Sequence, residues 1–202
     1  MQVEHKTTAE RLALFSDAVI AVIITIMVLE LKAPEENATF SALLPLWPTA
    51  VSYLISYLFI AIIWLNHHHL LHFVKYVTPG LIWGNFVHLF FVSLVPFTTA
   101  WIARTHLASA PVALYAAVFV CIDLAYCVFE RLAFEQADAS ELPEHVRRMA
   151  RRRSLITLMI FAAAMLCAMA APWAGFALIC CALFTYLVPE LRILHVTDKP
   201  QT

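Results

Sequence analysis

Long apolar runs constrain this chain most, because about 20 apolar residues in a helix match the thickness of a lipid bilayer. The first run, RLALFSDAVIAVIITIMVLELK, extends from Arg11 to Lys32. Asp17 interrupts the apolar core that a signal peptide requires, so we expect this run to be a transmembrane helix. The runs predict an all-α integral membrane protein with six transmembrane helices, at approximately Leu12–Leu31, Leu46–Asn66, Thr78–Ile102, Pro111–Arg131, Ser154–Ala171 and Pro172–Leu191.

The composition supports the same class of protein. Of the 202 residues, 62% are hydrophobic and 13% are charged, whereas roughly a quarter of a soluble domain is charged. The mean hydropathy is +0.80. The net charge of -1 argues against a nucleic-acid partner, since phosphate binding requires a surplus of basic residues. We therefore expect a single transmembrane domain over residues 1–202, embedded in a lipid bilayer.

The positions of lysine and arginine predict the orientation, because cytoplasmic loops of membrane proteins carry an excess of both. If the N-terminus is cytoplasmic, the outer segments hold only Lys32 and Arg104 of the thirteen basic residues. The eleven on the cytoplasmic side are Lys6, Arg11, Lys75, Arg131, Arg147, Arg148, Arg151, Arg152, Arg153, Arg192 and Lys199. We therefore expect a multi-pass protein of the cell membrane with both termini in the cytoplasm.

A helical wheel of the first run separates two faces. At about 100° per residue, five residues fall on one narrow stripe. The residues of this stripe are Ala18, Val22, Thr25, Ile26 and Leu29. Asp17 falls on almost the opposite face. By itself, such a stripe indicates only a packing surface.

A cluster of histidines, His67, His68, His69 and His72, lies in the segment WLNHHHLLH. HHHxxH resembles part of a histidine box of membrane di-iron oxygenases, which need around eight ligands from several boxes. Other histidines stand alone, among them His88, His106, His145 and His195. The cluster has three interpretations: hydrogen bonding at the inner interface, pH sensing, or metal chemistry. The sequence contains no HExxH, GxSxG or phosphate loop, so we expect no enzyme, no catalytic residue and no metal site.

Asp123 is a carboxylate well inside the fourth run, in the segment VCIDLAY. An ionisable side chain at that depth faces protein or water, because exposure to lipid costs several kcal/mol. Asp123 is therefore either part of an ion or proton pathway or a protonated or paired structural group. The sequence leaves both interpretations open.

The first run also resembles a known family. Arg11, Phe15, Ser16 and Asp17 match the RxxxFSD signature of the potassium channels of the transmembrane protein 175 family. The resemblance extends to TIMVLELK, IWLNHHHLLH and FFVSLVPFTTA, so it covers the first half of the chain. The usual FSDG reads FSDA here, with Ala18 as a mild departure. FSD occurs once, which is similar to the one-repeat prokaryotic form rather than the two-repeat animal form.

The resemblance implies a homotetramer whose first helices line a central pathway, with potassium as the permeant ion and no cofactor. It implies that Val22, Ile26 and Leu29 line the pore, and that Thr25 is a hydroxyl-bearing pore position. These residues belong to the stripe that the helical wheel defines. The resemblance also implies that the FSD residues hold the first helix against its own subunit.

The position of Asp17 opposite the stripe predicts a structural role. A buried carboxylate without a partner would cost several kcal/mol, so we expect Asp17 to accept hydrogen bonds. The expected donors are Arg11 and either Asn66 or His68, at the cytoplasmic end of the bundle. Such a network would orient the pore helix.

Apolar rings at the stripe positions predict a constriction that gates by dewetting. The chain has no TVGYG loop, so selectivity is expected to come from the helix-lined pore. Glu30 either raises the cation concentration at the outer mouth or caps the end of the helix. The alternatives are a secondary ion or proton transporter, which would show inverted repeats and interrupted helices, and a histidine-box membrane metalloenzyme.

Overall fold

The computed structural model is an all-helical bundle in which residues 2–34, 39–137 and 143–183 are described, with side chains from Thr8 onward. The helices are α1 (Gln2–Val28), η1 (Phe40–Leu46), α2 (Trp47–Leu71), α3 (Pro79–Val92), α4 (Val95–Arg104), α5 (Ser109–Phe134) and α6 (Glu144–Ala170). A shorter apolar helix, Pro172–Leu183, follows α6. The described residues contain no β-strand, which confirms the all-α class.

Five helical segments are long and apolar enough to cross a membrane. They are Thr8–Val28, Phe40–Leu71, Pro79–Arg104, Ser109–Phe134 and Glu144–Ala170. The sixth expected span corresponds to the helix Pro172–Leu183, and its remainder to Leu191 lies outside the described residues, as do Arg192, His195 and Lys199. The multi-pass membrane architecture is therefore confirmed, while the count of six spans stays a prediction.

The helix ends differ from the expected ones at several places. Helix α1 ends at Val28, and the chain continues in a tight turn in which the Leu29 and Glu30 amides donate to the Ile26 and Met27 carbonyls at 3.0 and 3.2 Å. Helix α2 continues to Leu71 and therefore includes three histidines of the cluster. Helix α6 begins at Glu144, so the run RRMARRR belongs to a helix.

The third span is interrupted between Val92 and Val95. Pro96 explains the break, because proline has no amide proton and its ring clashes with the carbonyl of the preceding turn. Helical hydrogen bonds nevertheless continue into the break, where the Ser93 amide donates to the Leu89 carbonyl at 2.9 Å. The break is therefore a kink in a continuous span.

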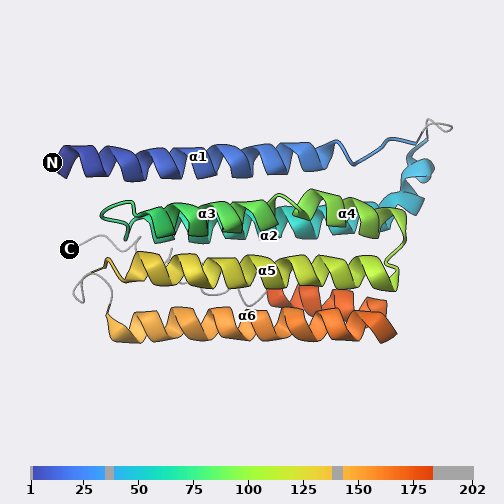
Figure 1. The fold of residues 1–202 in the computed structure, drawn as a ribbon. Helices are drawn as coiled ribbons and strands as arrows, with labels where there is room; N and C mark the ends of the chain where they lie inside the picture. The colour runs from blue at the N-terminus through green and yellow to red at the C-terminus, as the bar shows by residue number, and fades with distance from the viewer. Residues whose placement is uncertain (1, 35–38, 138–142, 184–202) are drawn as a thin grey trace, which may run out of the picture.

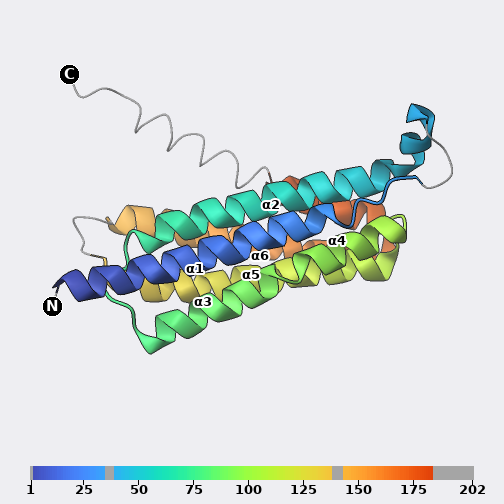
Figure 2. The ribbon, with the colours of Figure 1, turned by 90° about the horizontal axis from the view of Figure 1, so that it is seen from above.

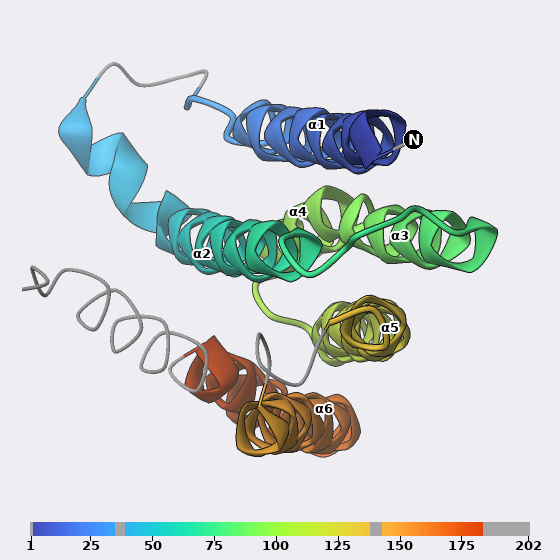
Figure 3. The same ribbon diagram turned by 90° about the vertical axis from the view of Figure 1, so that its left-hand side faces the viewer.

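The helices form successive layers, with α1 at one edge and α6 at the other (Figure 1). Between these edges lie a layer of α2 with α3 and α4, and then α5, as the end-on view shows (Figure 3). Seen from above, α1 lies over the space between α2 and the α3–α4 span (Figure 2). One end of the bundle contains the start of α1, the α2–α3 connection, the end of α5 and the start of α6 (Figure 1). Most of the basic residues that the structure describes lie at this end.

Aromatic packing holds the inner layers together. The rings of Phe59, Phe119 and Phe161, from α2, α5 and α6, lie with centroids 4.5 to 5.7 Å apart. Close backbone packing joins α6 to the following helix, because a Cβ at Gly175 would lie 2.8 Å from the Cα of Ala168. The fold therefore presents α1 as an edge helix on a well-packed bundle.

Candidate functional site

The stripe on α1 is exposed at the surface of the chain. The exposed fractions of Val22, Ile26 and Leu29 are 53%, 47% and 75%, and Ala18 and Thr25 are also exposed. The Thr25 hydroxyl donates to the Val22 carbonyl of its own helix at 2.8 Å. Leu29 lies one residue beyond the end of α1, in the tight turn. The stripe is thus an apolar surface that carries one hydroxyl.

The opposite face of α1 packs into the bundle. Ile20, Ile23 and Met27 are 1%, 5% and 1% exposed, and all three belong to the main hydrophobic core. Neighbouring isoleucines therefore have opposite environments, with Ile23 buried and Ile26 half-exposed. This separation matches the two faces that helical periodicity predicts.

An apolar groove of about 810 Å³ lies beside the stripe, between α1 and the α3–α4 span. Val22 and Ile26 form part of its α1 wall, and Pro96, Phe97 and Trp101 form part of the opposite wall. Glu30 and Arg104 lie at its outer end. The half of α1 that ends at Val28 is called the outer half below. It consequently contacts α4 less closely than a packed helix pair would.

A buried hydrogen-bond network fixes the other half of α1, which contains Ser16 and is called the inner half below. Ser16 is 0% exposed; its hydroxyl donates to the Leu12 carbonyl at 2.9 Å and accepts from the Asn85 amide at 2.9 Å. The carbonyl oxygen of the same Asn85 side chain lies 2.7 Å from Nε2 of His67, which therefore donates. The network joins α1, α3 and α2 in the interior, where hydrogen bonds are electrostatically strong.

Asp17 takes part in a second contact, with a donor that differs from the expected ones. Its carboxylate accepts a hydrogen bond from the Trp64 indole at 2.8 Å, rather than from Arg11, Asn66 or His68. His68 lies next to this contact, with its ring stacked on Trp64 at a centroid distance of 5.5 Å. Asp17 therefore attaches α1 to α2 of the same chain, on the side away from the stripe.

Asn66 has other partners. Its side-chain oxygen accepts from the Arg153 guanidinium at 3.0 Å, which links α2 to α6. Phe15 is 46% exposed and packs edge-on against Phe86 of α3 at a centroid distance of 5.4 Å. Arg11 is exposed on the first half of α1. The structure thus brings Phe15, Ser16 and Asp17 into contact with α2 and α3 and places Asn66 and Arg11 elsewhere.

Glu30 forms an ion pair across the outer end of the groove. The guanidinium of Arg104, the last residue of α4, lies 2.6 Å from the Glu30 carboxylate. The two side chains are 37% and 64% exposed, respectively. Arg104 therefore compensates the charge of the Glu30 carboxylate.

Asp123 lies in the interior, 6% exposed, beside a cavity of about 20 Å³. His88 and Tyr126 line the same cavity, which has room for roughly one water molecule. His88 is 1% exposed and its ring lies parallel to that of His67 at 6.0 Å. The cavity is enclosed by α2, α3, α5 and α6, far from the stripe on α1.

The histidine cluster does not converge on one point. His68 and His72 form an edge-to-face pair at 5.1 Å along the end of α2, whereas His67 points into the interior. Within the described part of the chain, no group of three or more His, Cys, Asp or Glu side chains could hold a metal ion.

Several residues that hold α1 against the bundle were not predictable from the sequence. Asn85 and Trp64 contact α1 directly, His67 bonds to Asn85, and Arg104 contacts Glu30 in the turn after α1. None of these four residues is close to α1 in the sequence. The available signal was the polarity of Asn85 within the apolar segment IWGNFVHLF, because a buried amide requires hydrogen-bond partners.

The chain is similar to known potassium channels. A model of the family described as endosomal/lysosomal potassium channel TMEM175 matches residues 11–96. A potassium channel of Chryseobacterium sp. (strain P1-3) is 34% identical over 187 residues, which cover 92% of this chain and 96% of the relative. The crystal structure of a lysosomal potassium-selective channel TMEM175 homolog from Chamaesiphon minutus matches with a TM-score of 0.79 and 25% identity, over 91% of this chain and 98% of that chain. The resemblance seen in the first half of the sequence thus extends to most of the chain.

Proposed function

This chain belongs to the TMEM175 family of potassium channels, and we propose on that basis that it conducts potassium ions down their electrochemical gradient. The exposed stripe on α1 carries this proposal. A helix at the edge of a membrane bundle, with half-exposed apolar residues on one face, is suited to a surface shared between subunits.

One α1 per chain cannot enclose a pathway, so conduction requires a closed ring of subunits. We propose a homotetramer, in which Val22, Thr25, Ile26 and Leu29 of each copy face the central axis. The contacts of Ser16 with Asn85 and of Asp17 with Trp64 support this arrangement, because they hold the opposite side of α1 against its own subunit.

The size of the side chains supports an apolar gate. Four helices at interaxial distances of 8–10 Å place each axis about 6–7 Å from the fourfold centre. An isoleucine or leucine side chain spans most of that distance, so rings of Val22, Ile26 and Leu29 exclude a hydrated ion when closed. Widening of these rings would wet the pore and permit conduction.

The charge distribution supports the proposed orientation. Arg148, Arg151 and Arg152 are exposed at the same end of the bundle as the start of α1, and Arg104 lies at the other end. Because the cytoplasmic segments of membrane proteins carry an excess of basic residues, we propose that the N-terminus and the α5–α6 connection face the cytoplasm. The ion pair with Arg104 favours a positioning role for Glu30 over attraction of cations.

The kink between α3 and α4 is relevant to the transporter alternative, because transporters use broken helices at their binding sites. In this chain, the Ser93 amide donates to the Leu89 carbonyl and the Leu94 amide to the Phe91 carbonyl. These hydrogen bonds leave the kink without the open helix ends that bind ions in such proteins. The channel is therefore the function that the structure supports best.

The test compares two isoleucines of the same helix. Ile26→Ala should raise potassium flux in reconstituted vesicles and weaken discrimination against sodium, because it widens a constriction once per subunit. Ile23→Ala removes the same hydrocarbon from the core, so it should cost about 2–5 kcal/mol of stability and leave the flux per folded channel nearly unchanged. If Ile23→Ala opened the pore and Ile26→Ala did not, the assigned pore face would be wrong.

The assembly is tested separately. Native mass spectrometry of the full chain in mild detergent should show four copies. A monomer that conducts ions after reconstitution would contradict the ring of subunits.

A further inference from the structure

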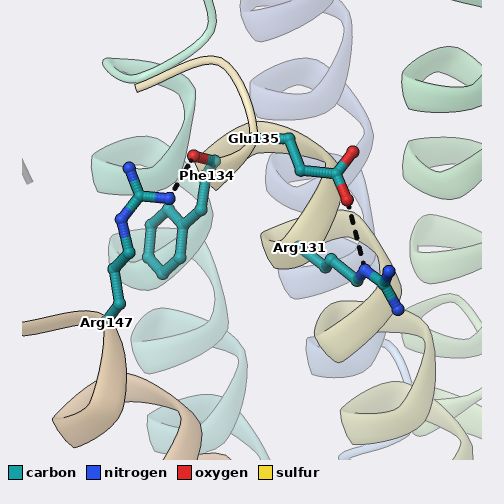
Figure 4. Close-up of polar contacts among 4 residues, drawn as sticks. All are labelled: Arg131, Phe134, Glu135 and Arg147. Atoms are coloured by element: carbon teal, nitrogen blue, oxygen red, sulfur yellow. Dashed lines mark hydrogen bonds and ion pairs between the residues drawn. The ribbon is translucent and has the colours of Figure 1, made fainter. Parts of the chain in front are cut away.

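The arginines in the first half of α6 fall into two groups with different surroundings. Arg147 points toward the end of α5, where its guanidinium donates to the Phe134 carbonyl at 2.8 Å (Figure 4). It also donates to the Ala137 carbonyl at 2.8 Å. Arg153 donates to Asn66 of α2 at 3.0 Å. These two arginines attach α6 to the bundle.

Arg148, Arg151 and Arg152 are exposed instead. Arg148 forms an ion pair with Glu144 of the same helix at 3.6 Å, and its side chain is 77% exposed. Arg151 and Arg152 have no hydrogen-bond or ion-pair partner among the residues that the structure describes. This group, Arg148, Arg151 and Arg152, is called the outward arginines below.

The outward arginines continue into an exposed apolar stripe. Arg148 and Arg152 share a helix face with Leu155, Met159 and Leu166, at spacings of four, three, four and seven residues. The three apolar residues are 50%, 68% and 69% exposed. The opposite face, which packs into the bundle, is formed by Ser154, Thr157, Phe161, Ala164 and Ala168. One outward face of α6 is therefore basic at its start and apolar along its remainder.

The length of this face of α6 matches the thickness of the hydrocarbon core of a bilayer. The segment from Arg152 to Ala170 is about 27 Å long at 1.5 Å per residue, close to the thickness of the hydrocarbon core. At the other end of the bundle, the exposed rings of Trp47 and Trp173 stack at 6.0 Å, and tryptophans commonly mark membrane interfaces. Arg148 and Arg152 consequently lie at the level of lipid headgroups.

Helix α6 also lies on the far side of the subunit from α1 (Figures 1 and 3). If α1 lines the central pore, a placement that rests on the proposed function, the outward face of α6 faces lipid. We propose that the outward arginines bind the phosphate of an anionic phospholipid, whose acyl chains lie against Leu155 and Met159. The charges favour an anionic lipid. Glu144 compensates only part of the charge on Arg148, and the positive charges of Arg151 and Arg152 are available to a phosphate.

The proposal is tested by lipid binding to the full chain in mild detergent. Phosphatidylglycerol or phosphatidylcholine is added, and bound lipid is counted by native mass spectrometry. The wild type should retain phosphatidylglycerol in preference, and R148Q/R152Q should reduce that preference on the order of tenfold. The single variant R152Q should show a smaller reduction, and it keeps the test available if the double variant folds poorly.

The matched control is K75Q/R131Q, which removes two charges from the same end of the bundle. Arg131 is exposed but forms an ion pair with Glu135 at 3.2 Å (Figure 4), and Lys75 lies in the α2–α3 connection. The control should keep the preference for phosphatidylglycerol. An equal loss in both double variants, or none in R148Q/R152Q, would overturn the proposal.

Soluble glycerol phosphate serves as a competitor. It should not displace bound phosphatidylglycerol at equal concentration, because it has no acyl chains to contact the apolar stripe. Displacement by glycerol phosphate would show that the outward arginines bind a free anion rather than a lipid, and would also overturn the proposal. Lipid counting requires no ion flux, so a failure here is distinguishable from a failure of the proposed channel function.

Discussion

The two halves of α1 are attached to the bundle in different ways. The inner half is held by buried hydrogen bonds, in which the Asn85 amide donates to the Ser16 hydroxyl and His67 donates to the Asn85 carbonyl oxygen. The outer half borders an apolar groove of about 810 Å³, which the exposed Glu30–Arg104 ion pair spans at its outer end. Buried hydrogen bonds are strong and costly to break, whereas exposed ion pairs contribute little. The polar contacts of α1 are therefore strong in its inner half and weak at its outer end, where Ile23 and Met27 hold the helix by apolar packing.

This difference has a consequence for the proposed gate. Val22 and Ile26 lie in the outer half of α1 and also line the groove. A change in the position of the outer half alters the distance between these side chains and the proposed pore axis, while the inner anchor stays in place. We therefore expect the inner hydrogen bonds to contribute more to stability than the outer ion pair, and the outer ion pair to influence conduction.

Among the polar contacts of α1, the largest expected effect is on the inner network. Asn85→Leu removes both hydrogen bonds of the amide and leaves Nε2 of His67 and the hydroxyl of Ser16 with one partner fewer in the interior. We expect a loss of about 3 kcal/mol in the free energy of unfolding, measured by titration with SDS in mixed micelles.

Thr25→Val provides the control for this prediction. It also removes a hydroxyl group that donates a hydrogen bond, but Thr25 is exposed in the outer half and bonds only to its own helix. Its effect on unfolding should stay within about 0.5 kcal/mol. Equal losses in Asn85→Leu and Thr25→Val would contradict the difference between the two halves.

A smaller effect is expected at Asp17, which is half-buried and accepts from the Trp64 indole at 2.8 Å. Asp17→Ala should lower thermal stability and tetramer yield, and should leave the preference for potassium over sodium unchanged. Trp64→Phe keeps an aromatic ring beside His68 but removes the donor. A double-mutant cycle of these changes should give a coupling of about 1–2 kcal/mol, and additive effects would exclude the bond as the cause.

The faces of α1 were predictable from the sequence, whereas its partners were not. Helical periodicity alone places Ile26 on the stripe, Ile23 in the core and Asp17 away from the stripe. The identity of Trp64 as the partner of Asp17 depends on the offset between α1 and α2 along their axes, which no local pattern encodes. The sequence therefore predicts Arg11 and either Asn66 or His68 as the donors, and the latter two lie close to Trp64 on the same helix.

Helix boundaries show the same limit. The sequence predicts one span at Thr78–Ile102 without a break, whereas the structure has a kink just before Pro96. The end of α1 at Val28 has no such signal, because the apolar run continues to Leu31 and the next proline is Pro34. The turn after Val28 brings Glu30 to Arg104, so the ion pair was also not predictable from the first run alone.

The smallest expected effect on stability is at this outer ion pair. The side chains of Glu30 and Arg104 are 37% and 64% exposed, so solvent screens their attraction and each long side chain loses entropy in the contact. Glu30→Gln and Arg104→Gln should each cost less than about 1 kcal/mol, and their coupling should fall further at about 1 M salt, where the Debye length is near 3 Å. If either variant destabilised the protein as much as Asn85→Leu, the outer half of α1 would be as firmly anchored as the inner half.

Conduction should respond to the same pair more than stability does. In the described part of the chain, the contact between Glu30 and Arg104 is the polar link from the outer end of α1 to α4 across the groove. Its loss allows the outer half of α1, with Ile26, to occupy a wider range of positions around the inner anchor. We therefore expect Glu30→Gln to change the potassium flux per folded channel, and Arg104→Gln to change it in the same direction. A role of Glu30 in attracting cations predicts opposite signs instead, because Arg104→Gln would then leave the carboxylate uncompensated and raise the flux, while Glu30→Gln would lower it. Flux from reconstituted vesicles, measured for both single variants at low salt, distinguishes a positioning contact from an electrostatic one.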